Sequence, residues 1–451
     1  MLLTETRIAS AASCNCHEQF LNLPSDRLKP SKTMRESLYI LYRKCRAFCN
    51  SLCFYLCRVF PIQNDLVSVC TFEGKGGFGC NPKYIVEELH RRVPALRFVW
   101  FVNDMAKEFP DYIQKVPNTL WSRAYWLSRS KVWIDNYRKP YGTRKRRGQL
   151  YVNTWHATIG FKSIGLWRGN GFSRMAELVS RNDSAMIDRV VIDSEWCAEM
   201  YPKGMVYDGE FLLSGAPRCD ILYGDRTAQK EDFRKKHGLA PDAKLVLFAP
   251  TFREYSVDGK RSVGAGTWTL DFNRLLDSLR TRFSGDWFLC IRVHPQLKKA
   301  ALDNMDASLK TAVIDISDEP DMNGNLAAMD AFVTDYSSAA MEAGFCRMPV
   351  FIYADDIGSY VSGRGSMLWN LSEDTNIPVG NNRTMTPGID TVLPYPVAKD
   401  NCELERRILE FDEAAYIRKE EQFEKDVELV FDGRASTRVA DWILEETGRE
   451  Q

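Results

Sequence analysis

Short apolar segments alternate with amphipathic segments along most of this chain, and this alternation restricts the possible fold more than any other feature. From Leu66 onward the apolar segments read LVSVCTF, LRFVWFV, KVWIDN, QLYVN and RVVIDS, with helical material between them. A helix is expected from Asn81, where NPKYIVEELHRRV has a proline at its start. Apolar strands separated by helices are typical of a parallel β-sheet with helices on both faces.

The same pattern starts again after the segment GLAPDAK at residues 238–244. The second series of strand-like segments is LVLFAP, WFLCIRVHP, AVIDI, AFVTD and PVFIY. The sequence therefore predicts an α/β protein with two doubly wound, Rossmann-type domains. We place the domains at 62–236 and 237–400, preceded by an N-terminal segment at 1–61 and followed by C-terminal helices at 401–451 that pack across both domains.

A basic amphipathic helix is predicted between Met34 and Pro61. Its apolar positions recur at steps of three and four, which places them on one stripe of a helix, whereas Asn50, Ser51 and several basic residues fall on the other side. The basic residues interrupt the apolar run too early for a membrane-spanning helix. A helix lying in the membrane interface fits this pattern, and a helix docked on the protein's own core is the alternative. The stripe consists of Leu38, Leu41, Cys45, Cys49, Leu52, Leu56 and Phe60.

The overall composition argues against nucleic acid as a partner. Lys plus Arg and Asp plus Glu both number 60, so the chain carries no net positive charge that would attract a polyanion such as nucleic acid. The basic segment TRKRRG at 143–148 has no interleaved aromatic residues and is interpreted as a solvated loop.

The 13 cysteines are scattered, and the chain does not open with a recognisable secretory signal. These features predict free thiols in a reducing cytoplasm. Cys14, Cys16 and His17 lack a second half with metal-ligand spacing, and no DxD-like acidic cluster requires a metal, so no bound metal is expected. No cofactor is expected either.

Residues suited to phosphate chemistry follow the predicted strands. In open α/β sheets, ligands bind beyond the carboxyl ends of the strands, so the residues at these positions are the candidates for a site. Arginine matches phosphate oxygens, and serines at a helix start favour an anion. The candidates are His156, Arg218, Thr251, Arg253, Arg292, His294, Ser337 and Ser338.

One histidine ends a strand in each half of the chain. His156 and His294 could therefore face each other across a cleft, one removing a proton from an attacking hydroxyl and the other stabilising phosphate charge. Taken singly, each feature has a simpler interpretation. A serine pair after a strand is commonly a helix cap, and a histidine at a strand end is often structural. Their joint placement favours a phosphate-handling cleft.

Six segments resemble the CDP-glycerol glycerophosphotransferases of bacterial teichoic acid and capsule synthesis. They are GCNPKYIVEEL, TWHATIGFKSIG, VVIDSEWCAEMY followed by LSGAPRCDIL, VLFAPTFRE, CIRVHP, and DEPDMNGNLAAMDAFVTDYSSAAMEAGFCRMPVFIYADD. The similarity runs from about Leu66 to Arg364, and VTDYSS with RVHP is its most specific pairing.

The resemblance implies a two-domain GT-B architecture and an enzyme that transfers glycerol phosphate from CDP-glycerol to a hydroxyl of a membrane-bound acceptor, a lipid-linked glycan or polyol phosphate, and releases CMP. It also implies peripheral association with the cytoplasmic face of the cell membrane. The two family histidines implicated in catalysis match His156 and His294. Ser337 and Ser338 match donor phosphate ligands, and the phosphate contacts expected from the other matching motifs are Arg218, Thr251, Arg253 and Arg292.

The loop after His156 departs from the family pattern. Many members have Gly-Thr-Pro-Leu there, whereas this chain has ATIGF, one residue longer before Lys162, which we assign to the acceptor side. The sequence leaves open whether the polyol phosphate is added once or repeatedly. It also leaves open whether the donor is CDP-ribitol instead of CDP-glycerol. Further alternatives are a GT-B glycosyltransferase that uses a sugar nucleotide, and a non-catalytic membrane-associated subunit.

Overall fold

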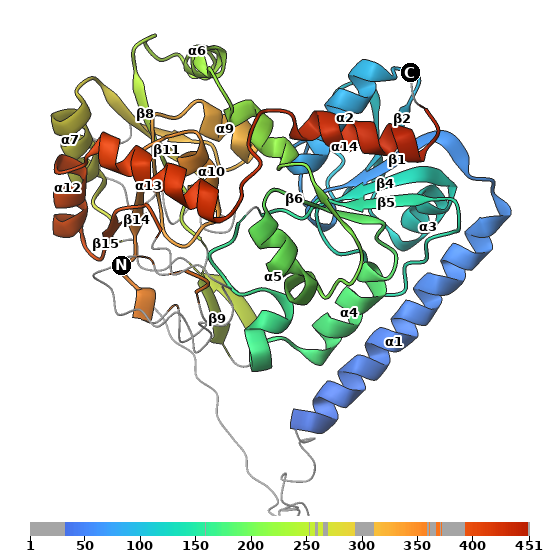
Figure 1. The fold of residues 1–451 in the computed structure, drawn as a ribbon. Coiled ribbons are helices and arrows are strands. Elements are labelled where there is room, and N and C mark those ends of the chain that lie inside the picture. Colours follow the sequence, from blue (N-terminus) through green and yellow to red (C-terminus); the bar gives the residue numbers. More distant parts are fainter. Residues whose placement is uncertain are drawn as a thin grey trace, which may run out of the picture. The chain divides into compact units, whose positions relative to one another are not determined.

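The computed structural model describes residues 32–157, 159–251, 253–257, 260–264, 269–293, 311–358, 360, 367–369, 371 and 393–449, with the backbone alone at 32–35, 253–257 and 260–264. The chain divides into two compact units, Met1–Cys45 and Arg46–Gln451. Both large sheets lie in the second unit (Figure 1).

The first sheet has seven parallel strands in the order β3-β2-β1-β4-β5-β6-β7. The strands are β1 (Gln63–Cys70), β2 (Arg97–Val102), β3 (Ile113–Pro117), β4 (Ser130–Asp135), β5 (Leu150–Asn153), β6 (Arg189–Ile192) and β7 (Phe211–Leu213). The helices between them are α2 (Cys80–Arg92), α3 (Leu120–Arg129), α4 (Arg174–Ser184) and α5 (Glu195–Met205).

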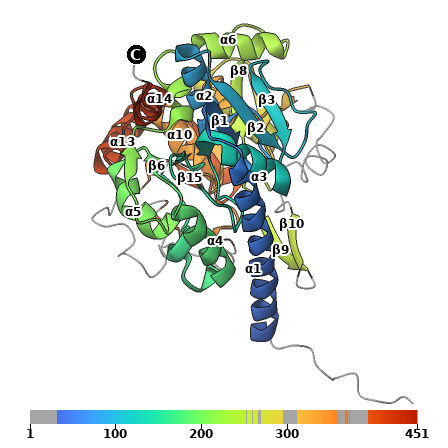
Figure 2. The same ribbon diagram turned by 90° about the vertical axis from the view of Figure 1, so that its right-hand side faces the viewer.

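Helices cover both faces of this sheet, as its apolar strands require. Val67 and Val69 of β1 belong to one buried cluster with side chains of α2, whereas Leu66 and Cys70 belong to another with side chains of α3. Successive residues of a strand point to opposite faces, so one short strand supplies both clusters. Figure 2 shows β1, β2 and β3 with these helices.

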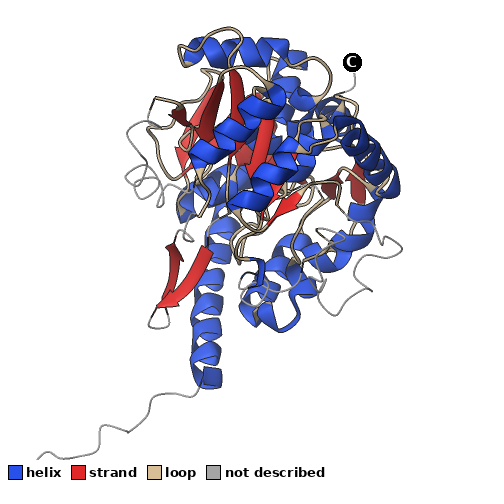
Figure 3. Cartoon of the chain, turned by 90° about the vertical axis from the view of Figure 1, so that its left-hand side faces the viewer, coloured by secondary structure: helices blue, strands red, loops and turns tan. Residues whose placement is uncertain are grey.

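The second sheet has six parallel strands in the order β12-β11-β8-β13-β14-β15. In Figure 3 helices lie across its strands. The strands are β8 (Lys244–Phe248), β11 (Trp287–Ile291), β12 (Val313–Asp315), β13 (Ala331–Thr334), β14 (Val350–Tyr353) and β15 (Val397–Ala398). The helices are α6 (Thr227–Lys236), α7 (Phe272–Phe283), α9 (Met322–Ala327) and α10 (Ala339–Phe345), and β9 (Arg253–Val257) pairs with β10 (Lys260–Gly264) in an antiparallel hairpin.

The C-terminal region forms three helices, α12 (Asn401–Leu409), α13 (Glu413–Asp426) and α14 (Ala435–Glu446). The side chains of Asp400 and Asp412 accept hydrogen bonds from backbone N–H groups in the first turns of α12 and α13, which fixes where these helices begin. Helix α14 packs against α2 and contributes Val439 and Ile443 to the same buried cluster.

Helix α1 (Lys32–Leu56) continues into a short 3-10 turn at Cys57–Val59, so the predicted helix is present. The face that packs in its second half is not the predicted apolar stripe. Ser51 donates a hydrogen bond to the carbonyl of Gly142 at 2.8 Å, Asn50 donates to Tyr141 at 3.1 Å, and Phe54 is fully buried. Small and polar residues form this face because the helix backbone comes close to Gly142, where a Cβ would lie 2.2 Å from the carbonyl oxygen of Ala47.

The predicted stripe is exposed instead. It includes Leu38, Leu41, Cys45, Cys49, Leu52, Leu56 and Phe60. Among the described residues, no helix combines the length and the apolar character needed to cross a membrane.

Candidate active site

His156 lies just beyond the carboxyl end of β5, beside the end of β4. These strands are neighbours in register, with Asp135 opposite Asn153, so the residues that follow them meet at one edge of the sheet. Nδ1 of His156 lies 2.8 Å from the carbonyl oxygen of Asn136, the residue that follows β4. A carbonyl oxygen only accepts hydrogen bonds, so Nδ1 carries the proton and Nε2 keeps its lone pair.

Burial lowers the pKa of His156 from 6.5 to about 4. The Asn136 carbonyl opposes this shift, and the positive charge of Arg218 adds to it. The imidazole is therefore neutral at pH 7. A neutral ring with an unprotonated Nε2 is the form that can accept a proton.

Aromatic rings surround this imidazole. Tyr137 stacks on it with ring centroids 5.3 Å apart, Phe72 meets it edge-on at 5.4 Å, and Trp155 lies at 4.3 Å. Trp155 and Phe72 both have left-handed backbone conformations, with φ of 50° and 48°. Such conformations are costly for bulky residues and persist where the surrounding structure holds them, often at functional sites.

Arg218 lies between the first and second sheets, in a buried network. Its guanidinium donates to the carbonyl oxygen of His156 at 2.8 Å and to Sγ of Cys80 at 3.2 Å, and forms an ion pair with Glu342 in α10. Asn323 donates to the other oxygen of the Glu342 carboxylate at 2.6 Å. Arg218 was predicted to bind phosphate, but in this structure its guanidinium binds acceptor groups of the protein itself.

Ser337 and Ser338 lie directly before α10 and are both half-buried. Oγ of Ser337 accepts a hydrogen bond from the backbone N–H of Ala339 at 3.3 Å. Ser338 and Glu342 are four residues apart and lie on the same side of the helical turn. Through Arg218, Glu342 thus links the helix that follows the serine pair to the backbone of His156.

Thr251 follows β8 and is bound to Asp335, which follows β13. Its backbone N–H and its hydroxyl each donate to the Asp335 carboxylate at 2.8 Å. Because β8 and β13 are adjacent strands, this pair joins their carboxyl ends next to the serine pair. Asp335 thereby fixes the start of the segment that carries Ser337.

Arg292 follows β11, and its guanidinium donates to the carbonyl oxygens of Ile316 at 3.2 Å and Glu319 at 2.5 Å. Burial lowers the pKa of this guanidinium from its usual value. His294 lies outside the described residues, and of Arg253 only the backbone is described, in β9. The convergence of two imidazoles on one cleft stays a prediction.

Lys162 belongs to the loop that follows His156. Its ammonium group lies 5.4 Å from the centre of the Tyr360 ring, and its backbone forms an antiparallel bridge with Met367. This loop, which follows β5 of the first sheet, therefore reaches residues that follow β14 of the second sheet.

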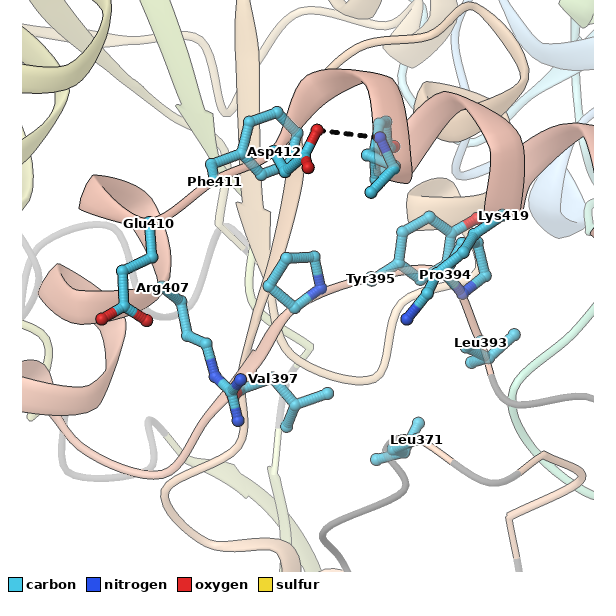
Figure 4. Close-up of a pocket in the computed structure, with 13 residues that line it drawn as sticks. Leu371, Leu393, Pro394, Tyr395, Val397, Arg407, Glu410, Phe411, Asp412 and Lys419 are labelled. Atoms are coloured by element: carbon cyan, nitrogen blue, oxygen red, sulfur yellow. Dashed lines mark hydrogen bonds between the residues drawn. The ribbon is translucent and has the colours of Figure 1, made fainter.

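A separate surface pocket lies among β15, α12 and α13 (Figure 4). Its lining includes Tyr395, Arg407, Phe411, Tyr416 and Lys419, and none of the predicted site residues. Within the described part of the chain, no three His, Cys, Asp or Glu side chains are grouped so that they could hold a metal ion.

The sequence did not single out Asn136, Asn81 or Glu342. Asn136 is the last residue of the predicted strand KVWIDN, so a rule that selects residues at strand ends could also have selected it. Asn81 is buried and donates to the carbonyl oxygens of Thr154 and Trp155 at 3.1 and 3.3 Å, which holds the residues before His156. A carboxylate inside the apolar helix SAAMEAGF was the available signal for Glu342.

Residues 52–445 match a protein family described as CDP-glycerol:poly(glycerophosphate) glycerophosphotransferase. The chain is 26% identical over 393 residues to the teichoic acid poly(glycerol phosphate) polymerase of Staphylococcus epidermidis, a match that covers 82% of this chain and 50% of that protein. It is also 26% identical to the teichoic acid glycerol-phosphate transferase of Staphylococcus aureus, over 87% of this chain and 95% of that protein. The chain thus spans about half the length of the first of these relatives and nearly all of the second.

A relative named for ribitol is equally similar. The teichoic acid poly(ribitol-phosphate) polymerase of Bacillus spizizenii is 26% identical, over 86% of this chain and 57% of that protein. Among solved structures, the wall teichoic acid polymerase TagF superposes with a TM-score of 0.71 at 23% identity, over 92% of this chain and 97% of that chain. The predicted GT-B-like fold with two parallel α/β sheets is thereby confirmed.

Proposed function

Because the chain belongs to the CDP-glycerol:poly(glycerophosphate) glycerophosphotransferase family, we propose that it transfers glycerol phosphate from CDP-glycerol to a hydroxyl of a membrane-bound acceptor and releases CMP. The acceptor is a lipid-linked glycan or polyol phosphate. The observation that carries this proposal is the state of His156, a neutral imidazole at a strand end whose protonated nitrogen is bound to Asn136.

In the proposed reaction the acceptor oxygen attacks the β-phosphorus of CDP-glycerol. A bond forms between that oxygen and the β-phosphorus, and the bond from the β-phosphorus to the bridging oxygen breaks. CMP leaves with the bridging oxygen, and the acceptor proton passes to Nε2 of His156. The bound Asn136 carbonyl then stabilises the protonated ring, because it accepts the hydrogen bond of Nδ1.

The second domain binds the donor in this proposal. Ser337 and Ser338 hold the pyrophosphate with their hydroxyl groups, and the clamp between Thr251 and Asp335 fixes the loop that carries them. Arg253, Arg292 and His294 keep their predicted roles as phosphate contacts, which binding experiments can test one residue at a time.

Replacing His156 with alanine tests the proposed base. The variant should lose nearly all transfer of labelled glycerol phosphate, while CDP-glycerol still binds, since the ring is not a donor ligand. Replacing Ser337 and Ser338 with alanine should instead weaken donor binding. Full transfer by the His156 variant would refute the proposal, and unchanged donor affinity in the serine variant would refute the assigned phosphate site.

CDP-ribitol is a second candidate donor, because a relative named for poly(ribitol phosphate) is as similar as those named for glycerol phosphate. Incubation with each donor and measurement of the product mass distinguish the two polyols. The nucleotide released is a further readout. CMP supports a CDP-polyol donor, UDP would indicate a glycosyltransferase, and no turnover would indicate a non-catalytic subunit.

The proposal also places the protein at the cytoplasmic face of the cell membrane, bound peripherally through α1. The second half of this helix exposes Phe48, Leu52, Tyr55 and Leu56, and Arg58 follows them. Apolar side chains beside basic residues suit the boundary between anionic headgroups and acyl chains.

Vesicle flotation tests this placement. Replacing Leu52 and Leu56 with glutamate should abolish binding to vesicles that contain phosphatidylglycerol and leave the melting temperature unchanged, because both side chains are exposed. Leu409→Glu is the matched control, since Leu409 is an exposed leucine on another helix. Equal vesicle binding by the wild type and the double variant would contradict the assigned surface.

A further inference from the structure

The buried pair of Arg218 and Glu342 joins the two sheet-containing domains. Arg218 is 6% exposed and Glu342 is 1% exposed. Taking two charges out of water is costly, so a buried pair is maintained only with good geometry and further hydrogen bonds. Here Asn323 binds the carboxylate, and the His156 carbonyl and Cys80 bind the guanidinium.

One guanidinium therefore contacts both halves of the proposed site. One of its nitrogens, Nη1, binds the carbonyl oxygen of His156, the residue assigned as the base. The other, Nη2, binds Glu342 in α10, which begins just after Ser337 and Ser338. The rigid planar fork of arginine can serve two acceptors in fixed directions at once.

Asn81 extends this network to the residues before His156. Its side-chain oxygen accepts from the backbone N–H of Arg218 at 3.0 Å, and its side-chain nitrogen donates to the carbonyl oxygens of Thr154 and Trp155. These bonds hold Trp155 in its left-handed conformation, with φ of 50°.

The far end of the loop that follows His156, at Gly160 and Phe161, is also bound to residues that follow β14. The backbone N–H of Leu368 donates to the carbonyl oxygen of Phe161 at 2.8 Å, and the indole nitrogen of Trp369 donates to Gly160 at 2.9 Å. Both ends of the loop are therefore linked to the second half of the chain. Its start is linked to Glu342 through Arg218, and its far end is bound directly by Leu368 and Trp369.

We propose that Arg218 is a positioning residue, which sets the orientation of His156 relative to the serine pair that precedes α10, and does not itself bind the donor phosphates. This inference rests on the proposed function, since it assigns His156 and the serines their roles. It changes the role that the sequence motif suggested for Arg218, from phosphate ligand to a link between base and donor.

Replacing Arg218 with lysine keeps the positive charge but removes the two-directional fork. Misplacement of a reacting group by about 1 Å can cost roughly 100-fold in rate, so kcat should fall by about that factor. The Kd for CDP-glycerol should stay within about threefold of the wild type. Glu342→Gln should likewise lower kcat and leave the Kd for CDP-glycerol nearly unchanged.

Lys83→Met is the matched control. Lys83 forms an ion pair with Asp321 at 2.6 Å, a link between the same two domains made by other residues. Its loss should lower the melting temperature but change kcat by less than about threefold, because the link does not carry the His156 carbonyl. Equal losses of kcat in the lysine and methionine variants would show that Arg218 only joins the domains, and a tenfold weaker Kd in Arg218→Lys would show that it binds phosphate.

The imidazole resonances give a readout that does not need turnover. The chain has five histidines, so His156 can be assigned in carbon-13-labelled protein by comparison with His156→Ala. The positioning role predicts an altered His156 resonance and pKa in Arg218→Lys and neither change in Lys83→Met. Unchanged His156 resonances in Arg218→Lys would overturn the inference, whereas absence of CDP-glycerol turnover in the wild type would count against the proposed function alone.

Discussion

If His156 is the base, the acid limb of the pH–rate profile should lie well below that of an ordinary histidine. Burial lowers the pKa of this imidazole from 6.5 to about 4. The difference between a pKa of 6.5 and one of about 4 corresponds to about 3 kcal/mol of free energy between the charged and neutral forms of the ring. Protonation occupies Nε2, so activity is present above this pKa and is lost as the pH falls through it.

The assay is kcat/KM for CDP-glycerol between pH 3.5 and 8, which reports on the free enzyme. A histidine with a pKa of 6.5 would be only about one-quarter deprotonated at pH 6, whereas His156 should keep almost its full rate there. Circular dichroism at each pH separates loss of the base from unfolding, and the residual rate of His156→Ala should show no such limb. A limb centred at 6.5 or above would refute the reasoning.

Three further substitutions test the packing that positions the site. Phe161→Ala should destabilise the fold by about 3–5 kcal/mol in denaturant unfolding, since this ring is 1% exposed, and a loss below about 1 kcal/mol would contradict its buried position. Gly142→Ala should increase hydrogen exchange in the second half of α1, because φ is +87° and a Cβ would lie 2.2 Å from the Ala47 carbonyl oxygen; unchanged exchange would argue against this contact. Burial raises the pKa of Glu420 from 4.5 to about 8. The stability that its protonated form contributes is therefore full below about pH 4.5 and is lost as the pH rises through 8. Glu420→Gln should have a higher melting temperature than the wild type at pH 9 but not at pH 5. An equal difference at both pH values would show that ionisation of Glu420 does not matter.

The buried strands were predictable because their apolar runs are continuous. The runs that became β1, β2, β4, β5 and β6 were all recognised, and so were β8, β11, β12, β13 and β14. The hairpin strands β9 and β10 were missed, and the missed strands of the two large sheets lie at sheet edges, where apolar runs shorten. β3 reads IQKVP with exposed positions, β7 has three residues and β15 has two.

The face of α1 that packs could not be predicted from periodicity. Hydrophobic spacing selects the most apolar stripe, but the contact with Gly142 depends on close approach of two backbones and on the hydrogen bonds of Asn50 and Ser51. Small polar residues can form such a face because their groups are satisfied by carbonyls from another part of the chain. Periodicity carries no information about that partner.

Within the candidate site, the sequence located residues but not their partners. The strand-end rule found His156 and Thr251, and the structure adds the carbonyl of Asn136 and the carboxylate of Asp335 that bind them. Motif matching assigned Arg218 to phosphate, because a sequence cannot show that Glu342, 124 residues away, supplies a buried counter-charge. The phosphate roles of the other arginines and the role of His294 stay predictions.

The most direct test of the central claim is a crystal structure of the His156→Ala variant with CDP-glycerol. The account predicts pyrophosphate oxygens about 3 Å from the hydroxyls of Ser337 and Ser338, with the β-phosphorus facing the position of the missing imidazole. A pyrophosphate bound away from the serine pair, or one whose β-phosphorus is screened from residue 156 by protein, would contradict it.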